Sequence, residues 1–118
     1  MKLRFARKKD FKYFFKDESV VYSSMAWVLL EGKNRVAIGG IWIMPNQFTS
    51  FVKTKDIANK TIFWKACKII TKELLKLELP IVCFRDESQI NSKKFLEKLG
   101  YKYLNTINNQ EVYKLCHK

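Results

Sequence analysis

The sequence contains little glycine. Only four of its 118 residues are glycine, and none occurs between Gly40 and Gly100. It has two prolines and no Gly-, Pro- or Ser-rich stretch of the kind that links domains. It also lacks internal repeats and low-complexity segments. We therefore expect one domain over residues 1–118, which is long enough for a single hydrophobic core.

Long apolar runs are missing as well. No run approaches the roughly 20 apolar residues that a helix needs to cross a bilayer. Residues 1–9 are charged and no apolar segment follows them, which does not fit a signal peptide. An apolar fraction of 47% with 14% aromatics is typical of a folded globular protein. These features predict a cytoplasmic protein that has no membrane partner.

Histidine and cysteine are scarce. His117 is the only histidine, and it lies next to the C-terminal residue. The three cysteines, Cys67, Cys83 and Cys116, do not have the spacing of metal ligands. A cysteine nucleophile also needs a base beside it. We expect no metal site, and ordinary buried thiols at Cys67 and Cys83, which lie within apolar patterns.

Acidic residues are outnumbered by basic ones. There are 11 Asp and Glu against 23 Lys and Arg, for a net charge of +12. Such a charge attracts nucleic acid, an anionic surface or a phosphorylated ligand. Nineteen of the basic residues are lysine, whereas base readout favours arginine. Nucleic-acid binding stays open as a hypothesis, and its expected carriers are Lys2, Arg4, Arg7, Lys8, Lys9 and a solvated stripe of Lys65, Lys68, Lys72 and Lys76.

Tryptophan does not suggest a base-stacking surface. Trp27, Trp42 and Trp64 each lie within an apolar pattern, so we expect them in the core.

Apolar periodicity predicts the elements of the N-terminal half. Phe11, Phe14 and Phe15 have helical spacing, and Gly32 marks a hairpin turn. Two adjacent glycines inside a strand, at 39–40, indicate a bulge or a close backbone approach. The expected elements are a strand over 2–6, a helix over 7–18, and strands over 20–31 and 35–44, the last buried at Val36, Ile38, Ile41 and Ile43.

The C-terminal half continues this alternation of strands and helices. Its longest helix has one apolar face, made of Phe63, Ala66, Cys67, Ile70, Leu74 and Leu77. Asp86 or Ser88 can cap the next helix, and Gly100 can close it. The expected elements are strands over 48–54, 81–84, 101–106 and 110–115, with helices over 57–78 and from about 88 to 99. The fold class is α/β, more specifically α+β: a mixed, mostly antiparallel sheet of six to seven strands flanked by three helices.

One segment of the sequence resembles a known family. Ser92, Phe95, Glu97, Lys98, Leu99, Gly100 and Tyr101 are similar to a late motif of the GNAT superfamily, the acetyl-CoA-dependent N-acetyltransferases. Arg4, Ala6 and Asp10 are similar to its opening pattern. The resemblance follows the order of elements along nearly the whole chain, and in residue identity it is specific over about 86–101. It implies a GNAT fold, acetyl-CoA as cofactor and an amine substrate.

The sequence departs from the family where the cofactor is bound. Members hold its pyrophosphate with a Q/R-x-x-G-x-G/A loop, in which glycines let backbone amides approach the phosphates. The corresponding segment, 52–61, has no glycine. Leu96 occupies the place of a common catalytic tyrosine, and Gln89 that of a usual asparagine. A short chain with these departures resembles the GNAT-like proteins of bacteriophages, which implies, as an alternative, a non-enzymatic protein with a virion or host partner.

The resemblance also implies a set of site residues. No Asp or Glu lies on the strand at 48–54 to act as a base. Asp56 just after it and Tyr101 are the catalytic candidates, although Asp56 is also expected as a helix cap and Tyr101 as a core residue. The candidate cofactor-binding residues are Phe51, Val52, Lys53, Lys55, Asn59, Lys60, Thr61 and Gln89.

Overall fold

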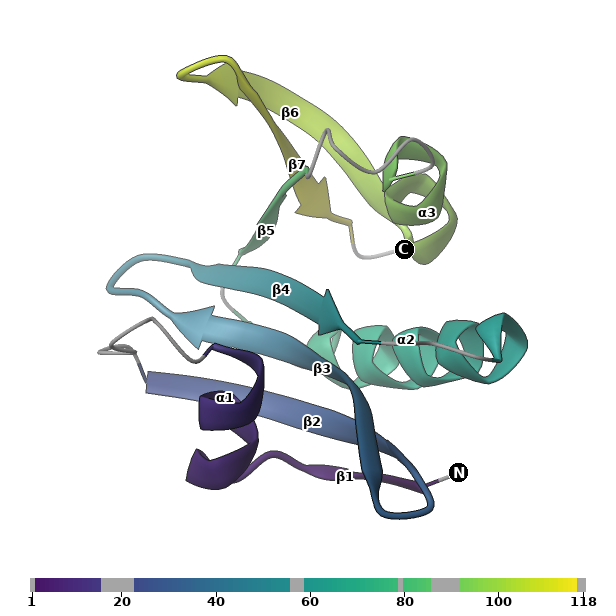
Figure 1. Cartoon of the computed structure of the whole chain (residues 1–118). Coiled ribbons are helices and arrows are strands. Elements are labelled where there is room, and N and C mark those ends of the chain that lie inside the picture. The colour runs from purple at the N-terminus through teal and green to yellow at the C-terminus, as the bar shows by residue number, and fades with distance from the viewer. Residues whose placement is uncertain (1, 16–22, 56–58, 79, 86–91, 117–118) are drawn as a thin grey trace.

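A computed structural model describes residues 2–15, 23–55, 59–78, 80–85 and 92–116 (Figure 1). The predicted order of strands and helices is confirmed. The elements are β1 (Lys2–Phe5), α1 (Lys8–Phe14), β2 (Ser23–Glu31), β3 (Asn34–Ile43), β4 (Phe48–Thr54), α2 (Lys60–Leu74), β5 (Ile81–Phe84), α3 (Ser92–Leu99), β6 (Tyr101–Ile107) and β7 (Gln110–Leu115).

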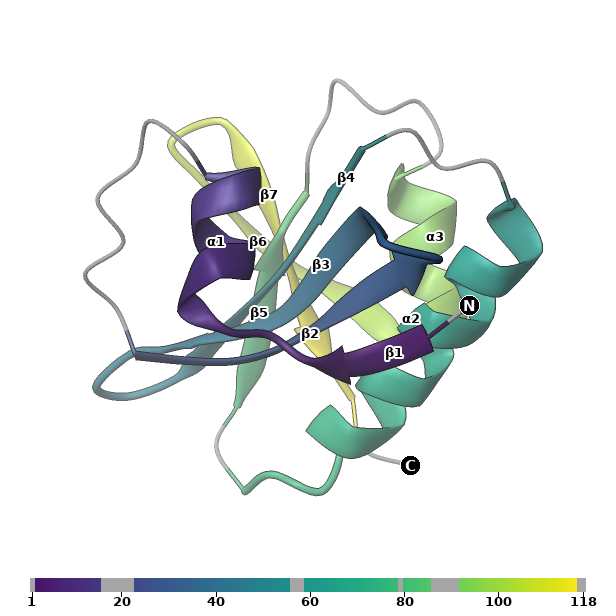
Figure 2. The same ribbon diagram turned by 60° about the horizontal axis from the view of Figure 1, so that its bottom comes forward.

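The strands form one seven-stranded sheet in the order β1-β2-β3-β4-β5-β7-β6. Every neighbouring pair is antiparallel except β4 and β5, which are parallel. Figure 2 shows α1 on one face of the sheet and α2 with α3 on the other. The predicted fold class, a mixed and mostly antiparallel sheet with three helices, is therefore confirmed. None of the helices in the described ranges is long and apolar enough to span a membrane.

The largest core cluster lies between the sheet and the helices α2 and α3. It contains Leu74 of α2, Leu96 of α3, and Ile81 and Tyr113 from the sheet, all almost fully buried. A second cluster packs Phe14 of α1 against β2 and β3. Burying apolar area of this kind supplies most of the free energy of folding.

The long helix is shorter than its apolar pattern predicts. Asn59 caps it, because its Oδ1 accepts a hydrogen bond from the Ile62 N–H at 3.1 Å. At the other end, the N–H groups of Lys76 and Leu77 bond to carbonyls three residues back, so the chain tightens and the α-helix ends at Leu74. The side chain of Leu77 still packs against the core from this final turn.

The adjacent glycines allow two strands to approach closely. A Cβ on Gly40 would overlap the backbone of Met25 and Ala26 on β2. The irregularity in the β2–β3 ladder lies instead at Leu29 and Leu30. Of the two readings that the sequence offered for these glycines, close approach is the correct one.

Two burial predictions need correction. Ile43 is 42% exposed, because it occupies the last paired position of β3, beyond the area that the helices cover. Trp27 is buried as predicted, but Trp42 and Trp64 are only half-buried. Trp42 lies beside α1 and Trp64 lies between α2 and α3, so both pack at the margins of the core.

Two tight turns shape the C-terminal end, and the one at Gly100 was predicted. Gly100 has a φ of +103° and its N–H bonds to the Glu97 carbonyl, which closes α3 as a glycine at this position should. Asn108 and Asn109 both have positive φ and join β6 to β7 in a two-residue turn. The predicted caps Asp86 and Ser88 lie outside the described residues.

Candidate active site

The two parallel strands at the centre of the sheet separate partway along their length. The β4–β5 ladder has three register pairs and ends at Ser50 and Cys83. β4 nevertheless runs on to Thr54, paired with β3 on its other side. Within the described residues, the edge of 51–54 that faces β5 has no strand partner. Figure 1 shows the two strands diverging from this point, β4 toward the start of α2 and β5 toward β7.

Side chains beyond the separation point alternate between the two faces of the sheet. Val52 is on the α2 face, where it lies near Gly39, and is 48% exposed. Phe51 is on the α1 face, where its ring stacks on Trp42 with centroids 4.3 Å apart. Phe11 and Phe15 of α1 complete this aromatic cluster. Phe51 is therefore occupied with packing, and what it can offer a ligand is its backbone.

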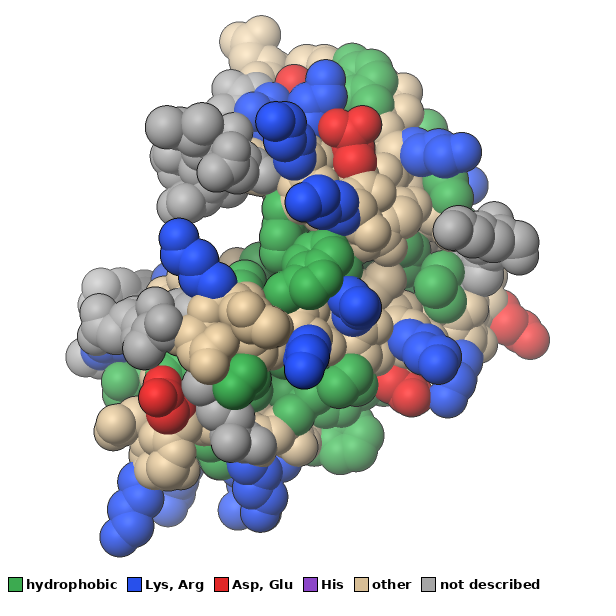
Figure 3. Space-filling model, turned by 90° about the vertical axis from the view of Figure 1, so that its right-hand side faces the viewer, with side chains coloured by type: hydrophobic (Ala, Val, Ile, Leu, Met, Phe, Trp, Pro, Cys, Tyr) green, Lys and Arg blue, Asp and Glu red, His purple; other side chains and the backbone are tan. Residues whose placement is uncertain are grey.

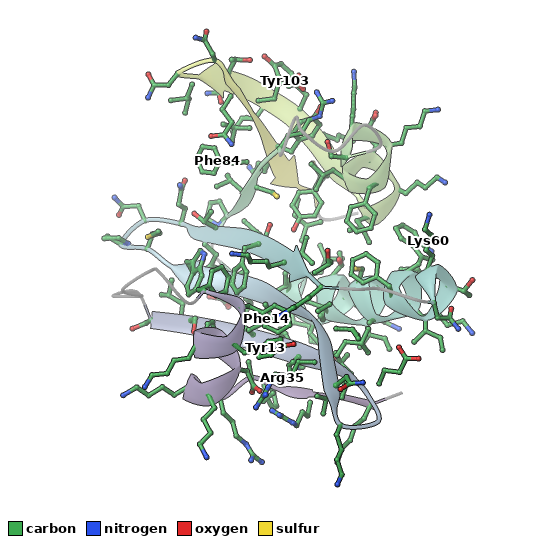
Figure 4. All side chains as sticks on the ribbon, viewed as in Figure 1. Tyr13, Phe14, Arg35, Lys60, Phe84 and Tyr103 are labelled. Atoms are coloured by element: carbon green, nitrogen blue, oxygen red, sulfur yellow. The ribbon has the colours of Figure 1, made fainter. Side chains whose placement is uncertain are left out.

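Lys53 and Lys55 place their charges on the α1 face. The Lys53 ammonium lies 4.6 Å from the centre of the Phe15 ring, and the Lys55 ammonium lies 4.6 Å from that of Tyr13. Arg35 approaches the same Tyr13 ring, as Figure 4 shows. Contacts of a cation with a ring face are attractive and hold the cation in place. Neither ammonium is directed toward the start of α2, where a bound phosphate was expected.

The start of α2 has free backbone donors. Asn59 satisfies the N–H of Ile62, and the first intrahelical bond is donated by Phe63. Among the described residues, the N–H groups of Lys60 and Thr61 have no acceptor. Both residues are exposed, and Figure 4 shows Lys60 at the outer end of α2. The positive end of the helix dipole and these donors favour an anion at this position.

A chain of hydrogen bonds crosses the point where β4 and β5 separate. Tyr101 OH donates to Ser50 Oγ at 2.8 Å, and Ser50 Oγ donates to the Val82 carbonyl at 3.3 Å. Burial raises the pKa of Tyr101 well above its ordinary value. Burial likewise raises the pKa of the Cys67 thiol to about 12. The prediction that Tyr101 is a core residue is confirmed, and its hydroxyl stays protonated.

Three more positions singled out in the sequence are Leu96, Asp56 and Gln89. Leu96, which the resemblance places at the family's tyrosine position, is buried in the main core cluster. The cap of α2 is Asn59 and not Asp56, whose own position lies outside the described residues. Gln89 also lies outside them. The described residues contain no group of three or more His, Cys, Asp or Glu placed to hold a metal ion.

Sequence reasoning missed Ser50. Phe48, Ser50 and Val52 alternate onto one face of β4, and that face is covered by α2. A hydroxyl at the middle, inward position of an otherwise apolar strand face was the available signal, because a buried hydroxyl has to find hydrogen-bond partners.

It also missed a half-buried ion-pair network beside the end of β5. Arg85 binds both carboxylate oxygens of Glu111, at 3.0 and 3.2 Å, and its Nε donates to Ser92 Oγ at the start of α3. Tyr113 OH donates to the same carboxylate at 2.8 Å. Burial and the neighbouring carboxylate raise the pKa of Tyr113 to about 12. The network fixes α3 against β5 and β7, and so fixes one wall of the separation.

Comparison with known proteins identifies the fold. No protein-family model matches the chain, and no curated protein matches its sequence. An N-acetyltransferase from Staphylococcus aureus Mu50 superposes with a TM-score of 0.69 at 13% identity, over 96% of this chain and 95% of that one. The ribosomal-protein-S18-alanine N-acetyltransferase from Escherichia coli gives 0.67 at 11% identity, over 99% and 95%.

A structure from Bordetella pertussis assigned to the GnaT-family acetyltransferases gives a TM-score of 0.65 at 10% identity, and this chain covers 66% of its length. At such identities the likeness concerns the fold. The protein has the GNAT acetyltransferase fold, as its late sequence motif predicted. The resemblance to the short bacteriophage proteins stays a prediction.

Proposed function

We propose that the protein is an acetyl-CoA-dependent N-acetyltransferase whose cofactor lies in the separation between β4 and β5. The observation that carries this proposal is the end of the β4–β5 ladder at Ser50 and Cys83, while β4 continues to Thr54 with one edge unpaired. Support also comes from the fold that the chain shares with N-acetyltransferases.

The free edge of β4 suits an extended ligand that carries amide groups. A chain of this kind adds to a sheet edge through backbone hydrogen bonds, in the way that a further strand would. Residues 51–53 would supply the backbone groups. Val52 would supply an apolar contact on the α2 face, where it is exposed. This contribution needs no particular side chain, so the missing family loop does not affect it.

The start of α2 suits the phosphates. In place of a glycine-rich loop, the chain offers the N–H groups of Lys60 and Thr61 and the charge of the exposed Lys60 side chain. A lysine attracts phosphate as a point charge and without a shaped cradle. Lys53 and Lys55 were expected to bind the phosphates too. In the proposal they do not, because their ammonium groups lie over aromatic rings of the α1 segment.

Acetyl-CoA, when bound, supplies a thioester that an amine can attack. The chain's contribution would be to hold both partners in line, which by itself accounts for large rate accelerations. Tyr101 is committed to Ser50 and has a raised pKa, so we assign it to positioning β4 rather than to proton transfer. Asp56 remains the candidate base.

The proposal is tested by thermal unfolding with acetyl-CoA and by an acetyl-transfer assay over a panel of amines. A ligand at about 100 times its Kd stabilises the folded state by about 2.7 kcal/mol. We expect that shift with acetyl-CoA and with CoA, and a smaller one with pantetheine at the same concentration, because pantetheine keeps the contacts with β4 but lacks the phosphates. If millimolar acetyl-CoA leaves the melting temperature unchanged, the proposal is wrong.

A second candidate is a non-enzymatic protein that keeps the fold and binds another macromolecule. Leu96 favours it, because a core leucine has replaced the tyrosine that many family members use as an acid. The same assay separates the two candidates. Binding of acetyl-CoA without transfer to any amine supports the second candidate.

A further inference from the structure

Three aromatic side chains join α2 to α3. Phe63 and Phe95 stack with ring centroids 6.0 Å apart and planes 4° apart. Trp64 meets Phe95 edge-on at 5.6 Å. All three side chains are only half-buried, so part of the aromatic surface is open to solvent. The two helices therefore share a surface with aromatic groups at its centre.

Lysines surround these rings. Lys68 lies one helical turn after Trp64, and Lys98 lies one turn after Phe95, so each shares a helix side with a ring. Figure 3, the view from the right-hand side of Figure 1, shows hydrophobic side chains in the middle of the surface, with basic side chains above and below them and a few acidic ones among these. The exposed lysines of the two helices are Lys60, Lys65, Lys68, Lys72, Lys93, Lys94 and Lys98.

Few opposite charges offset them. The described residues of the two helices contain two carboxylates, Glu73 and Glu97. Glu73 is paired with Lys76, which follows α2, at 3.1 Å. The other lysines of the stripe make no ion pair within the described residues. We name this lysine-bordered aromatic surface of α2 and α3 the α2–α3 face.

Three of the four arginines are held in ion pairs with carboxylates. Arg4 and Arg35 both bind the buried Asp10 carboxylate, at 2.8 and 2.7 Å. Arg85 is held by Glu111 in the same way. Arginine forks that would read bases are thus largely occupied, whereas Lys65, Lys68 and Lys72 of the α2–α3 face make no ion pair within the described residues. Lysine ammonium groups attract phosphates without selecting a sequence.

We propose that the α2–α3 face binds single-stranded nucleic acid without sequence preference. Its lysines would contact successive phosphates, and Trp64 and Phe95 would stack against bases. The rings favour a single strand over a duplex. Unpaired bases can stack on exposed aromatic side chains, whereas the bases of a duplex are already stacked on one another. This binding does not depend on acetyl transfer.

Binding to a fluorescein-labelled oligothymidylate, followed by fluorescence anisotropy over a range of salt concentrations, tests the proposal. Each phosphate contact on a single strand contributes about −0.7 to the slope of log K against log salt, so four lysine contacts predict a slope of about −3. Tryptophan fluorescence reports the stacking. We expect quenching on binding in the wild type and loss of most of that quenching in Trp64→Phe, since Trp27 is buried and Trp42 lies beside α1.

Two double variants of equal charge locate the surface. Lys68→Gln with Lys98→Gln removes two cations from the α2–α3 face, and Lys8→Gln with Lys12→Gln removes two exposed cations from α1 on the other side of the sheet. We expect the first pair to reduce the salt slope by about 1.4, which is two contacts, and the second to leave it nearly unchanged.

Several results would overturn the proposal. These are no binding at low salt, equal loss in both double variants, full quenching in Trp64→Phe, or a duplex of the same sequence that binds more tightly. Tighter binding to vesicles of anionic lipid than to the oligonucleotide would assign the face to membranes. Displacement of the oligonucleotide by acetyl-CoA, with acetyl-CoA affinity weakened equally by the first pair, would assign these lysines to the cofactor.

Discussion

Tyr101 OH donates a 2.8 Å hydrogen bond to Ser50 Oγ, which joins residues 51 positions apart in the chain. Ser50 belongs to the last register pair of the β4–β5 ladder, and Tyr101 opens β6 at the far edge of the sheet. The bond therefore fastens the two parts of the sheet together at the point where they separate. This bond helps to fix the distance between the two parts of the sheet, and so the width of the separation in which a ligand would lie.

Tyr101→Phe should destabilise the protein by about 1–3 kcal/mol, because Ser50 Oγ loses its donor inside the core while the packing volume stays nearly constant. Urea unfolding measures the change. Ser50→Ala in the Tyr101→Phe background is the control, since the second substitution should add much less than it does in the wild type. Fully additive free energies would mean that the two hydroxyls are not coupled.

Gly40→Ala should be strongly destabilising, by more than the approximately 1 kcal/mol typical of point substitutions. The new methyl group would overlap the backbone of β2 at Ala26, and backbone cannot move aside without opening the ladder. Gly39→Ala is the matched control, because its methyl group would meet the Phe51 carbonyl at 3.4 Å. Chemical unfolding of both variants measures the difference. Equal stability of the two would refute the close approach of β2 and β3 at this position.

Asp10 should make stability depend on acidic pH. Its carboxyl is buried, which alone would raise its pKa, but hydrogen bonds from Arg4, Arg35 and the Arg7 N–H hold the pKa below the ordinary value. A carboxyl with a lowered folded-state pKa stabilises the fold above its unfolded pKa of about 3.9, and that contribution is lost as pH falls further. Unfolding free energies at several pH values should fall below pH 4 more steeply for the wild type than for Asp10→Asn. Parallel curves would contradict this assignment.

Lys53→Gln should change acetyl-CoA affinity little, because the Lys53 ammonium lies over the Phe15 ring on the α1 face. Lys60→Gln should weaken it more, since Lys60 stands beside the free amides of α2. Isothermal calorimetry measures acetyl-CoA affinity in both variants, which are comparable because each loses one positive charge. A larger effect at Lys53 would restore the phosphate role that the sequence resemblance implied for it.

The sequence predicted the fold best where the signal came from turn residues and strand patterns. The strand at 48–54 has the bounds expected from its pattern, and Gly100 and the turn at Asn108 and Asn109 have the backbone angles that their residue types favour. The end of α2 was misjudged because apolar periodicity continues through Leu77, while the backbone has already tightened after Leu74.

The candidate site was harder to predict, because its contacts are distant in sequence. No periodicity in the sequence indicates the hydrogen bond from Tyr101 to Ser50. The charges of Lys53 and Lys55 could not be assigned to a face of the sheet before the position of α1 over β4 was known. The expected site residues Asp56 and Gln89 lie outside the described residues, so their roles stay predictions.

The most direct test of the proposed cofactor site removes one backbone donor at the start of α2. Thr61→Pro deletes an N–H that has no acceptor among the described residues, and proline is tolerated in the first turn of a helix. Thr61→Ala keeps the N–H and serves as the control. Calorimetry should show acetyl-CoA binding to Thr61→Ala as to the wild type, and at least tenfold weaker binding to Thr61→Pro, as expected for the loss of about 1.5–3 kcal/mol from a hydrogen bond to a charged group. Equal affinity in the two folded variants, or no binding to any of them, would contradict the proposed site.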